Sequence, residues 1–380
     1  MIEINGAYSK AKIFADEIEE TAKNQIIQLV NHPISKNAHI RIMPDVHAGL
    51  GCVIGYTAYL GDMVIPNLIG VDIGCGVLAF CFKGLDLGKS DFVEIDNIIR
   101  KNIPSGTKVR CSFSKNVYEV SKRLGLDFDK FEKKLERIAK KTNQDINYVL
   151  NSIGTLGSGN HFIEIDKSDK NICFVVHSGS RNFGLSIANY HQKKAKKVCR
   201  DNVPKGMEYL VGIDAKEYME DMKTAQIFAK LNRYTILHTI IKEFVGSLNF
   251  ETIESVHNYI NFDDKIVRKG AISAHKGERV IIPLNMAEGV VVGIGKGNND
   301  WNMSAPHGAG RLMSRKQAKK SLSLNEFKNS MKSVFSTCVN KKTIDESPMA
   351  YKDKDYILNK LKENVDVLYI AKPIYNFKAV

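Results

Sequence analysis

The sequence predicts an α+β fold, an irregular mixed α/β arrangement, within one large domain that spans residues 1–380. Strand-like and helix-like runs are mixed along the chain, without the regular β–α–β alternation of a doubly wound sheet. No stretch is rich enough in Pro, Gly or Ser to serve as a linker, and no internal repeat is visible. The glycines cluster in loops between short β-branched runs, as expected for short strands joined by tight turns.

The first half of the chain is expected to start with strands and to continue with helices. Residues 38–82 alternate β-branched runs with glycine turns, which predicts strands. Residues 92–101 predict a short helix, and residues 115–151 predict several helices, because apolar residues recur three and four apart amid Lys and Glu. Two strand-and-turn pieces follow, at residues 154–165 and 171–181.

The second half is expected to be helical first and extended last. Residues 183–245 predict mostly helix, and the longest periodic stretch runs from Ala215 to Leu248. Short strands are predicted within residues 252–300, and helices within 314–335 and 355–363. The tail, residues 365–380, is expected to be extended.

Composition excludes several classes of protein and favours one class of partner. With 43% hydrophobic and 26% charged residues, the chain as a whole is neither disordered, collagen-like nor a coiled-coil array. The 55 basic and 42 acidic residues leave a net charge of +13, which fits a polyanion such as nucleic acid, although a lysine-rich solvated surface is the alternative.

Cysteine usage and the N-terminus bear on the compartment. Seven cysteines at irregular spacings, without a CxxC, argue against a disulfide framework and for a reducing compartment. The start, MIEINGAYSK, has no basic segment followed by an apolar core, and no apolar run is long enough to span a membrane. A cytoplasmic protein with no membrane partner is expected.

The strongest chemical signal is a set of metal-binding residue types in glycine-rich turns. Asp72 and Cys75 share the turn of residues 70–76, where glycines let side chains converge. Taken singly, each nearby histidine is more often structural, but four of the ten stand at strand ends or turns, which favours a site. This donor set suits Zn, Mn, Fe or Co, and a shared Cys could bridge two ions. The candidates are Asp72, Cys75, His161, His177, His257 and His307.

Cationic side chains stand in or beside the same loops. Guanidinium forks match phosphate oxygens, so these residues are candidates for phosphate binding, with an ordinary surface charge as the alternative. His47 is a turn residue that could equally belong to the site or not. The cationic candidates are Arg181, Lys269, Arg311 and Lys378.

These motifs, in this order, resemble the RtcB family of RNA ligases. The resemblance runs from residue 43 to residue 378, and several long motifs in collinear order carry it. The matching segments are MPDVHAGLGCVIG, GVDIGCGV, GTLGSGNHFIEI, VVHSGSR, HNYI, RKGAISAHKGE, GKGN, HGAGRLMSR, DESPMAYKD and the near-terminal Lys378.

The resemblance implies a single RtcB-like domain with a metal site in a central cleft. It implies a GTP- and Mn-dependent ligase that joins RNA 3′-phosphate or 2′,3′-cyclic phosphate ends to 5′-hydroxyl ends, in RNA repair or tRNA splicing. A histidine would attack the α-phosphorus of GTP, pass GMP to the RNA 3′-phosphate, and the 5′-hydroxyl would then displace GMP. An archease-like activator is a further implied partner.

The resemblance also assigns roles to individual residues. It makes His307 the guanylylated nucleophile and Cys75 the ligand shared by two Mn ions. The other implied metal ligands are Asp72, His161, His177 and His257. The implied GTP or GMP contacts are Asp45, Asn160, Phe162, Glu164, Asn258, Gly308, Ala309, Gly310, Arg311, Tyr351 and Lys378. Arg181 and Lys269 match phosphate or RNA contacts.

Two segments depart from the family pattern, and two other functions compete with ligation. The chain has Ser-Ala-Pro before His307 where members read Ser-Cys-Ser, and Pro-Leu-Asn-Met-Ala at residues 283–287 where members read Pro-Gly-Ser-Met-Gly. One alternative is a metal-dependent RNA-end phosphatase or cyclic phosphodiesterase that has lost joining. The other is a noncatalytic RNA-binding protein, which the net charge of +13 suggests.

Overall fold

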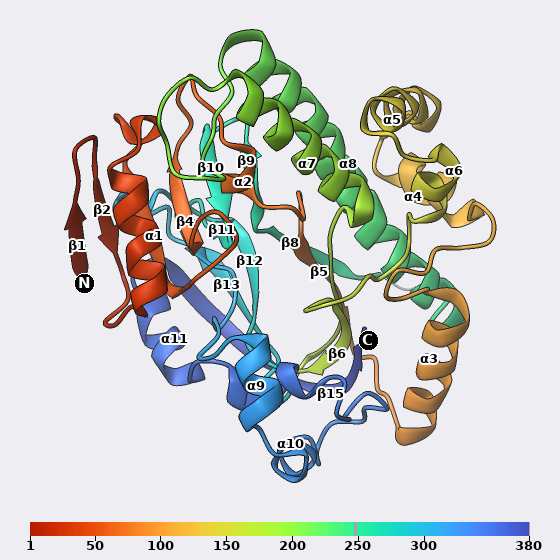
Figure 1. The fold of residues 1–380 in the computed structure, drawn as a ribbon. Helices are drawn as coiled ribbons and strands as arrows, with labels where there is room; N and C mark the ends of the chain where they lie inside the picture. Colours follow the sequence, from red (N-terminus) through yellow and green to blue (C-terminus); the bar gives the residue numbers. More distant parts are fainter. Residues whose placement is uncertain (247–248, 380) are drawn as a thin grey trace.

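The computed structural model describes residues 1–246 and 249–379, and it confirms the predicted α+β class. In this part of the chain the strands form a six-stranded sheet, a seven-stranded sheet and a two-stranded pair, with helices packed around them (Figure 1). The six-stranded sheet has the order β1 (Ile2–Asn5), β2 (Lys10–Ile13), β3 (Ile40–His47), β4 (Ile54–Tyr59), β10 (Ile266–Lys269) and β9 (Asn258–Asn261).

The seven-stranded sheet is antiparallel throughout its described pairs. Its order is β12 (Arg279–Pro283), β13 (Val290–Gly295), β15 (Val365–Lys378), β6 (Phe162–Lys167), β7 (Asn171–Ser178), β5 (Gly76–Lys83) and β8 (Glu251–Val256). The two-stranded pair joins β11 (Ala271–Ser273) to β14 (Ser304–Pro306).

The two edge strands of the seven-stranded sheet meet. The backbone N–H of Ile281 in β12 donates to Oγ of Ser255 in β8 over 2.9 Å. The sheet therefore curls on itself, and its inner face encloses a cluster of mostly small and β-branched side chains. This cluster contains Val77, Ala79, Cys81, Phe162, Cys173, Val175, Ile253, Ile281, Val290, Val292 and Ala371.

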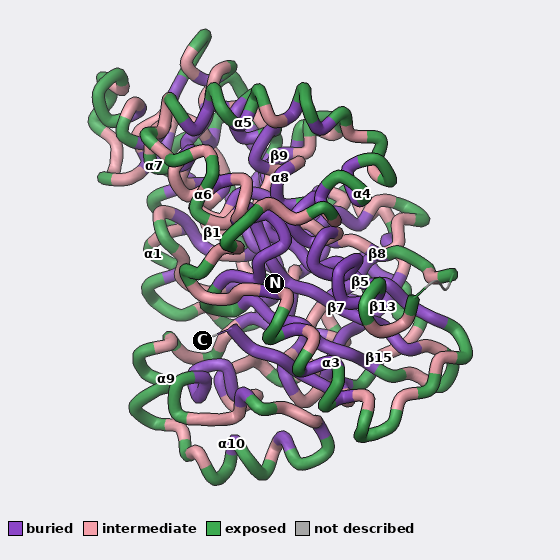
Figure 2. Tube along the Cα trace, turned by 90° about the vertical axis from the view of Figure 1, so that its right-hand side faces the viewer, coloured by how far each residue is buried: buried purple, intermediate pink, exposed green. Residues whose placement is uncertain are grey.

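Helices cover the outer face of the curled sheet. The long helix α8 (Gly212–Phe244) packs Ile236 and Ile240 against Leu78 of β5, in one apolar cluster with Ile95 of α3 (Lys89–Asn102). Figure 2 shows buried residues concentrated along the central strands, while peripheral helices such as α9 and α10 are largely exposed. The other helices are α1 (Glu20–Val30), α2 (Pro66–Ile69), α4 (Lys115–Arg123), α5 (Phe128–Thr142), α6 (Ile146–Asn151), α7 (Arg181–Val198), α9 (Arg315–Ser321), α10 (Leu324–Ser330) and α11 (Lys354–Leu361).

The C-terminal strand brings the end of the chain to the middle of the molecule. The first part of β15 pairs with β13, and its second part pairs with β6. In this register Lys378 lies opposite Phe162, and Asn376 lies opposite Glu164. Residues more than 200 positions apart in sequence therefore share one end of the curled sheet.

Most predicted elements are confirmed, and the differences have local causes. The segment of residues 63–70, expected to be extended, contains α2, because Pro66 at the first helical position presets the backbone angle of a helix. The sequence pattern assigns no element to residues 1–37, where the structure has β1, β2 and α1. Ser247 and Leu248 of the longest periodic stretch, and Val380 of the tail, lie outside the described residues.

Cysteine pairing differs from the expectation at one place. The structure joins Cys81 of β5 to Cys173 of β7 in a disulfide, because the strand register sets them directly opposite each other. The other five cysteines are free.

Within the described residues, no helix combines the length and the apolar character needed to cross a membrane.

Candidate active site

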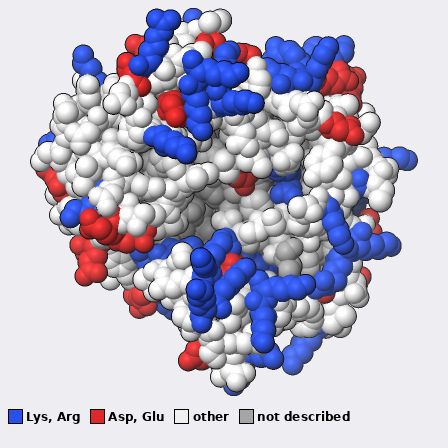
Figure 3. Space-filling model, viewed as in Figure 1, with Lys and Arg blue, Asp and Glu red and all other residues white. Residues whose placement is uncertain are grey.

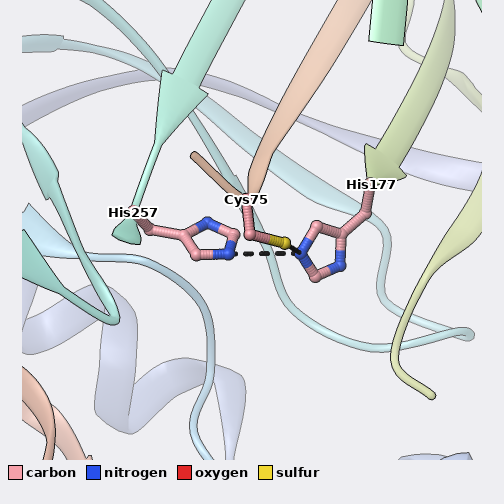
Figure 4. Close-up of side chains that lie close together, drawn as sticks. All are labelled: Cys75, His177 and His257. Carbon is pink, nitrogen blue, oxygen red and sulfur yellow. Dashed lines mark hydrogen bonds between the residues drawn. The ribbon is translucent and has the colours of Figure 1, made fainter. Parts of the chain in front are cut away.

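Three neighbouring strands deliver Cys75, His177 and His257 to the same end of the curled sheet. Cys75 stands directly before β5, whose first residues pair with the end of β7 that carries His177. On its other side β5 pairs with β8, and His257 directly follows β8. Figure 4 shows the three side chains pointing toward one another from these strands.

The donor atoms of these residues are close together. Sγ of Cys75 lies 3.2 Å from Nε2 of His177, which lies 3.2 Å from Nε2 of His257. Cys75 also belongs to a second group with Asp72 and His161, where Nε2 of His161 lies 3.0 Å from Oδ2 of Asp72 and 3.5 Å from the Cys75 sulfur. The two groups therefore share one sulfur atom.

The histidine protons face away from the shared sulfur. Nδ1 of His161 donates to the carbonyl of Leu156 over 2.8 Å, and Nδ1 of His177 donates to the carbonyl of Asn160 over 3.2 Å. A carbonyl can only accept, so both Nδ1 protons point away from the donor cluster. Nε2 of His177 presents a bare lone pair to its neighbours, and Nε2 of His161 faces the Asp72 carboxylate. The pKa values of His177 and His257 are lowered well below the ordinary value, mainly by burial, and this keeps both rings neutral.

The Asp72 carboxylate is held in its ionised form. Burial alone would raise its pKa, but the hydrogen bond and charge interaction with His161 outweigh that effect and lower the pKa to about 2. The backbone N–H of Ser180 also donates to Oδ1 of Asp72. Gly179 is required beside it, because a Cβ there would lie 2.1 Å from Oδ1.

Lone pairs that face one another without protons repel, and a bound cation removes that repulsion. Burial and the nearby Asp72 carboxylate raise the pKa of the Cys75 thiol well above its ordinary value, so a cation would convert it into a thiolate ligand on binding. One carboxylate, one sulfur and three imidazoles are the donors that first-row transition metals prefer. Histidines braced through Nδ1 by a carbonyl are also typical of metal sites. The residues present fit a metal centre.

His307 lies next to this cluster and is held by a buried carboxylate. Its ring centroid is 4.9 Å from that of His257. Nδ1 of His307 donates to Oδ2 of Asp45 over 2.6 Å, and the His307 backbone N–H donates to the same oxygen over 3.2 Å. The bond at Nδ1 fixes the tautomer, so Nε2 carries the free lone pair.

The chain reaches this geometry through a glycine turn after β14. Gly310 has a φ of +73°, and a Cβ at this residue would lie 2.5 Å from the carbonyl oxygen of Asp45. Only glycine allows the turn after His307 to approach the Asp45 backbone so closely.

A pocket opens beside His307, at the end of the curled sheet. Phe162 and Glu164 of β6 and Asn376 of β15 form its inner part, where Nδ2 of Asn376 donates to Oε2 of Glu164 over 2.5 Å. Residues 283–286, which depart from the family pattern, form another part of its wall. The lining residues are His47, Asn160, Phe162, Glu164, His177, His257, Pro283, Leu284, Asn285, Met286, His307, Gly308, Ala309, Gly310, Arg311, Arg315, Glu346, Tyr351, Asn376 and Lys378.

Glu346 lies on one side of the pocket, and it is not among the site residues predicted from the sequence. Its carboxylate accepts from the Lys378 ammonium at 2.6 Å and from the Tyr351 hydroxyl at 2.8 Å, and it pairs with the guanidiniums of Arg311 and Arg315. Burial would raise the pKa of Glu346, but Lys378 and the two arginines lower it to about 2. The signal was present, since Glu346 lies inside the quoted motif DESPMAYKD.

Three predicted residues lie beside the pocket without lining it. The Lys269 amine donates to the carbonyls of Leu50 and Asn67. Arg181 donates to Thr155 and to the Gly106 carbonyl, close to Asp72. Asn258 donates to the Asp72 carbonyl over 3.3 Å. Each of the three braces a loop around the donor cluster, and the other predicted nucleotide contacts line the pocket except Asp45, which lies behind His307.

Comparisons with known proteins show which family this chain is similar to. The family described as "tRNA-splicing ligase RtcB" matches residues 25–379. The chain is 33% identical to "RNA-splicing ligase RtcB" of Escherichia coli K12 over 394 aligned residues, which cover 94% of each protein. It is 27% identical to "tRNA-splicing ligase RtcB" of Nanoarchaeum equitans, over 90% of this chain and 87% of that protein.

Proposed function

The chain belongs to the RtcB family, and from this premise we propose that it is an RNA ligase that joins 3′-phosphate or 2′,3′-cyclic phosphate ends to 5′-hydroxyl ends. Repair of broken RNA or splicing of tRNA would supply such ends. The family match over residues 25–379 supports treating residues 1–380 as one domain.

One observation carries this proposal, the bond between His307 and Asp45. In the proposed reaction Nε2 of His307 attacks the α-phosphorus of GTP, the bond to the β-phosphate oxygen breaks, and pyrophosphate leaves. The ring then carries GMP and a positive charge, which the Asp45 carboxylate at Nδ1 stabilises. A hydrolase of RNA ends needs no such nucleophile.

The later steps return the imidazole to its starting state. The RNA 3′-phosphate attacks the phosphorus of the bound GMP, the N–P bond breaks, and an RNA(3′)pp(5′)G end forms. The 5′-hydroxyl of the second RNA then attacks the 3′-phosphate and releases GMP. A 2′,3′-cyclic phosphate must first be opened by water to a 3′-phosphate.

We propose that the two donor groups hold two Mn²⁺ ions that share Cys75. Asp72 and His161 would bind one ion, and His177 and His257 the other. Ions bound there would neutralise phosphate charge and acidify an attacking hydroxyl. The neutral histidines and the ionised Asp72 are ready to bind cations without a prior change of protonation.

We propose that guanine lies against Phe162 with its N1–H and N2–H groups on Glu164. An ionised carboxylate accepts both bonds, whereas adenine offers no N1–H and would leave the buried acceptor unpaired. Arg311 and Lys378 stand in the same pocket with their charges partly compensated by Glu346.

The surface around the pocket suits a polyanion. Figure 3 shows a hollow near the middle of this face, with Lys and Arg side chains gathered over α9 at its edge. The exposed lysines of α9 are Lys316, Lys319 and Lys320, and Arg315 of the same helix lines the pocket. We propose that an RNA strand enters across α9.

The test is covalent labelling. The protein is incubated with Mn²⁺ and GTP labelled at the α-phosphate, then denatured and examined for retained label. In a separate reaction, the folded protein receives a 3′-phosphate RNA and a 5′-hydroxyl RNA, with or without archease, and joining is measured. The proposal expects acid-labile label on the protein and a joined product. Release of phosphate from RNA ends without any protein label would instead identify a phosphatase.

A further inference from the structure

The inner face of β6 carries a second acid beside the proposed base-binding carboxylate. Residues two apart on a strand point to the same face, so Asp166 follows Phe162 and Glu164 along the inside of the curled sheet. Asp166 has no exposed surface, and Glu164 is 2% exposed. Apart from the Glu164 carboxyl, neither Asp166 oxygen has a hydrogen-bond partner among the described residues.

In the described part of the chain, no cationic side chain forms an ion pair with Asp166. Opposite it, β7 presents Cys173, which is in a disulfide and does not titrate, and β15 presents Pro373. Beyond them the inner face is mostly apolar, and Arg279 of β12, on the same face, is paired with Glu251. The charged group that acts on the pair is Lys378 of β15, which influences Glu164 and is itself paired with Glu346. Two negative charges side by side in this interior would be strongly unfavourable.

The carboxyl pair therefore holds one proton. Which of the two groups carries this proton decides whether Glu164 can accept hydrogen bonds from guanine. If Glu164 carried the proton, it would donate its O–H to Asp166 and face guanine as a neutral carboxyl, which is a weaker acceptor for the N1–H. If Asp166 carries it, Glu164 is fully ionised and receives O–H from Asp166 and N–H from Asn376. Its remaining lone pairs are then free for a base.

We propose that Asp166 is a positioning residue that stays protonated and donates its O–H to Glu164, which fixes Glu164 as the single ionised acceptor for guanine. This inference rests on the proposed function, since it assigns the means by which the same pocket selects its nucleotide. Asp166 does not touch the nucleotide and acts only through Glu164.

Two substitutions separate this role from simple packing. Asp166→Asn keeps a neutral hydrogen-bond donor of the same shape, whereas Asp166→Val removes the donor but suits a buried strand. For guanylylation by GTP, Asp166→Asn is expected to keep KM close to the wild-type value. Asp166→Val is expected to raise KM about tenfold or more with little change in kcat, because a lost hydrogen bond to a charged group weakens binding by roughly that factor.

Inosine triphosphate, which lacks the exocyclic amine, provides the second readout. The wild type and Asp166→Asn should prefer GTP over inosine triphosphate, and Asp166→Val should lose most of that preference. Wild-type KM and preference in Asp166→Val would overturn the proposal. Equal losses of kcat and of melting temperature in both variants would do so too, since they would indicate a packing role alone.

A measurement on the free protein keeps this test separate from that of the proposed function. Infrared difference spectra between the wild type and Asp166→Asn at neutral pH should show the C=O stretch of a protonated carboxyl, present only in the wild type. Absence of that band refutes the protonated Asp166 whether or not GTP is a substrate. If the band is present but GTP leaves no label on the wild-type protein, the proposed function is wrong, whereas the protonation of Asp166 is confirmed.

Discussion

His307 and Asp45 lie 262 positions apart in sequence, yet a hydrogen bond of 2.6 Å joins Nδ1 of the ring to Oδ2 of the carboxylate. Asp45 is completely buried in β3, and its other oxygen, Oδ1, has no hydrogen-bond partner in the described part of the chain. The carboxylate is therefore dedicated to His307. A buried carboxylate that accepts hydrogen bonds from one residue alone among those described is costly, even with the Lys352 ammonium nearby, which indicates that the contact serves chemistry more than stability.

The first prediction concerns this pair. Asp45→Asn should lower the rate of guanylylation by roughly 10²-fold or more, because an amide cannot stabilise the charged ring and does not enforce its tautomer. His307→Ala should abolish labelling entirely. Labelling rates and metal content are measured on each variant, with His275→Ala as the control, since His275 pairs with Asp264 away from the pocket.

The His307→Ala variant also separates ligation steps. It should keep its metal, since the five donor residues remain, and it should still seal a pre-made RNA(3′)pp(5′)G end to a 5′-hydroxyl. A folded, metal-loaded variant that still becomes guanylylated would disprove the assignment of the nucleophile. Failure on the pre-activated end as well would give His307 a structural role.

The second prediction concerns the shared sulfur. Cys75→Ala should lose most bound Mn²⁺ and all joining activity, because alanine offers no atom in place of a ligand common to both groups. Cys338→Ala is the matched control, since Cys338 is also a buried free cysteine but lies outside the donor cluster. Metal content is measured after dialysis by elemental analysis, and wild-type content in Cys75→Ala would reject the site.

The helices, the strands and the donor cluster were largely predictable, because both the secondary structure and the motifs depend on residues close together in the sequence. Helical periodicity predicted α8, a short helix was expected at α3 and an extended tail at β15, and the glycine-rich turns around Cys75 and His307 indicated the candidate site. Contacts made by long-range strand pairing were not predictable. Asn376 reaches Glu164 only because β15 pairs with β6 in one register, and a shift by one residue would turn Asn376 away.

The direction of the Arg315 side chain was likewise not predictable from the sequence. Its helix, α9, was predicted, but nothing in the spacing of its residues shows that Arg315 faces Glu346 while Lys316 faces solvent. The cations named from the sequence divide in the same way. Arg311 lines the pocket, whereas the Lys269 amine is taken up by two loop carbonyls.

The third prediction concerns nucleotide choice. Glu164→Gln should raise KM for GTP about tenfold or more and should weaken discrimination against ATP, because the amide replaces one acceptor with a donor. Labelling with each nucleotide, over a range of concentrations, provides both values. Glu326→Gln on the exposed side of α10 serves as the control. Equal labelling of the wild type by GTP and ATP would remove Glu164 from base recognition.

The fourth prediction concerns RNA binding across α9. Neutralising Lys316, Lys319 and Lys320 together should weaken RNA binding and flatten its salt dependence, with about 0.7 units of log–log slope lost per missing phosphate contact. The matched control neutralises Lys133, Lys134 and Lys140, three exposed lysines of α5. Affinity is measured between low and moderate salt, and an equal change of slope in both triple variants would show that only net charge matters.

The last prediction follows from the protonation of the buried carboxyl pair. Burial raises the pKa of Glu164 to about 7 and raises the pKa of Asp166 well above its ordinary value of 3.8. The folded state thus binds protons more tightly than the unfolded chain, so this contribution to stability is complete below about pH 4 and is lost as pH rises through about 7.

Asp166→Asn removes one of the two acids, so its free energy of unfolding should fall less with pH than that of the wild type. The difference in melting temperature, variant minus wild type, is therefore expected to grow by several degrees between about pH 4 and pH 8. Calorimetry at successive pH values across this range measures it. Asp86→Asn is the control, since the Asp86 side chain is 88% exposed and its pKa is lowered by Lys167 rather than raised. A difference for Asp166→Asn that stays constant or shrinks over this range would mean that the pair is not protonated in the folded protein, because an ionised Asp166 would gain stability with rising pH instead of losing it.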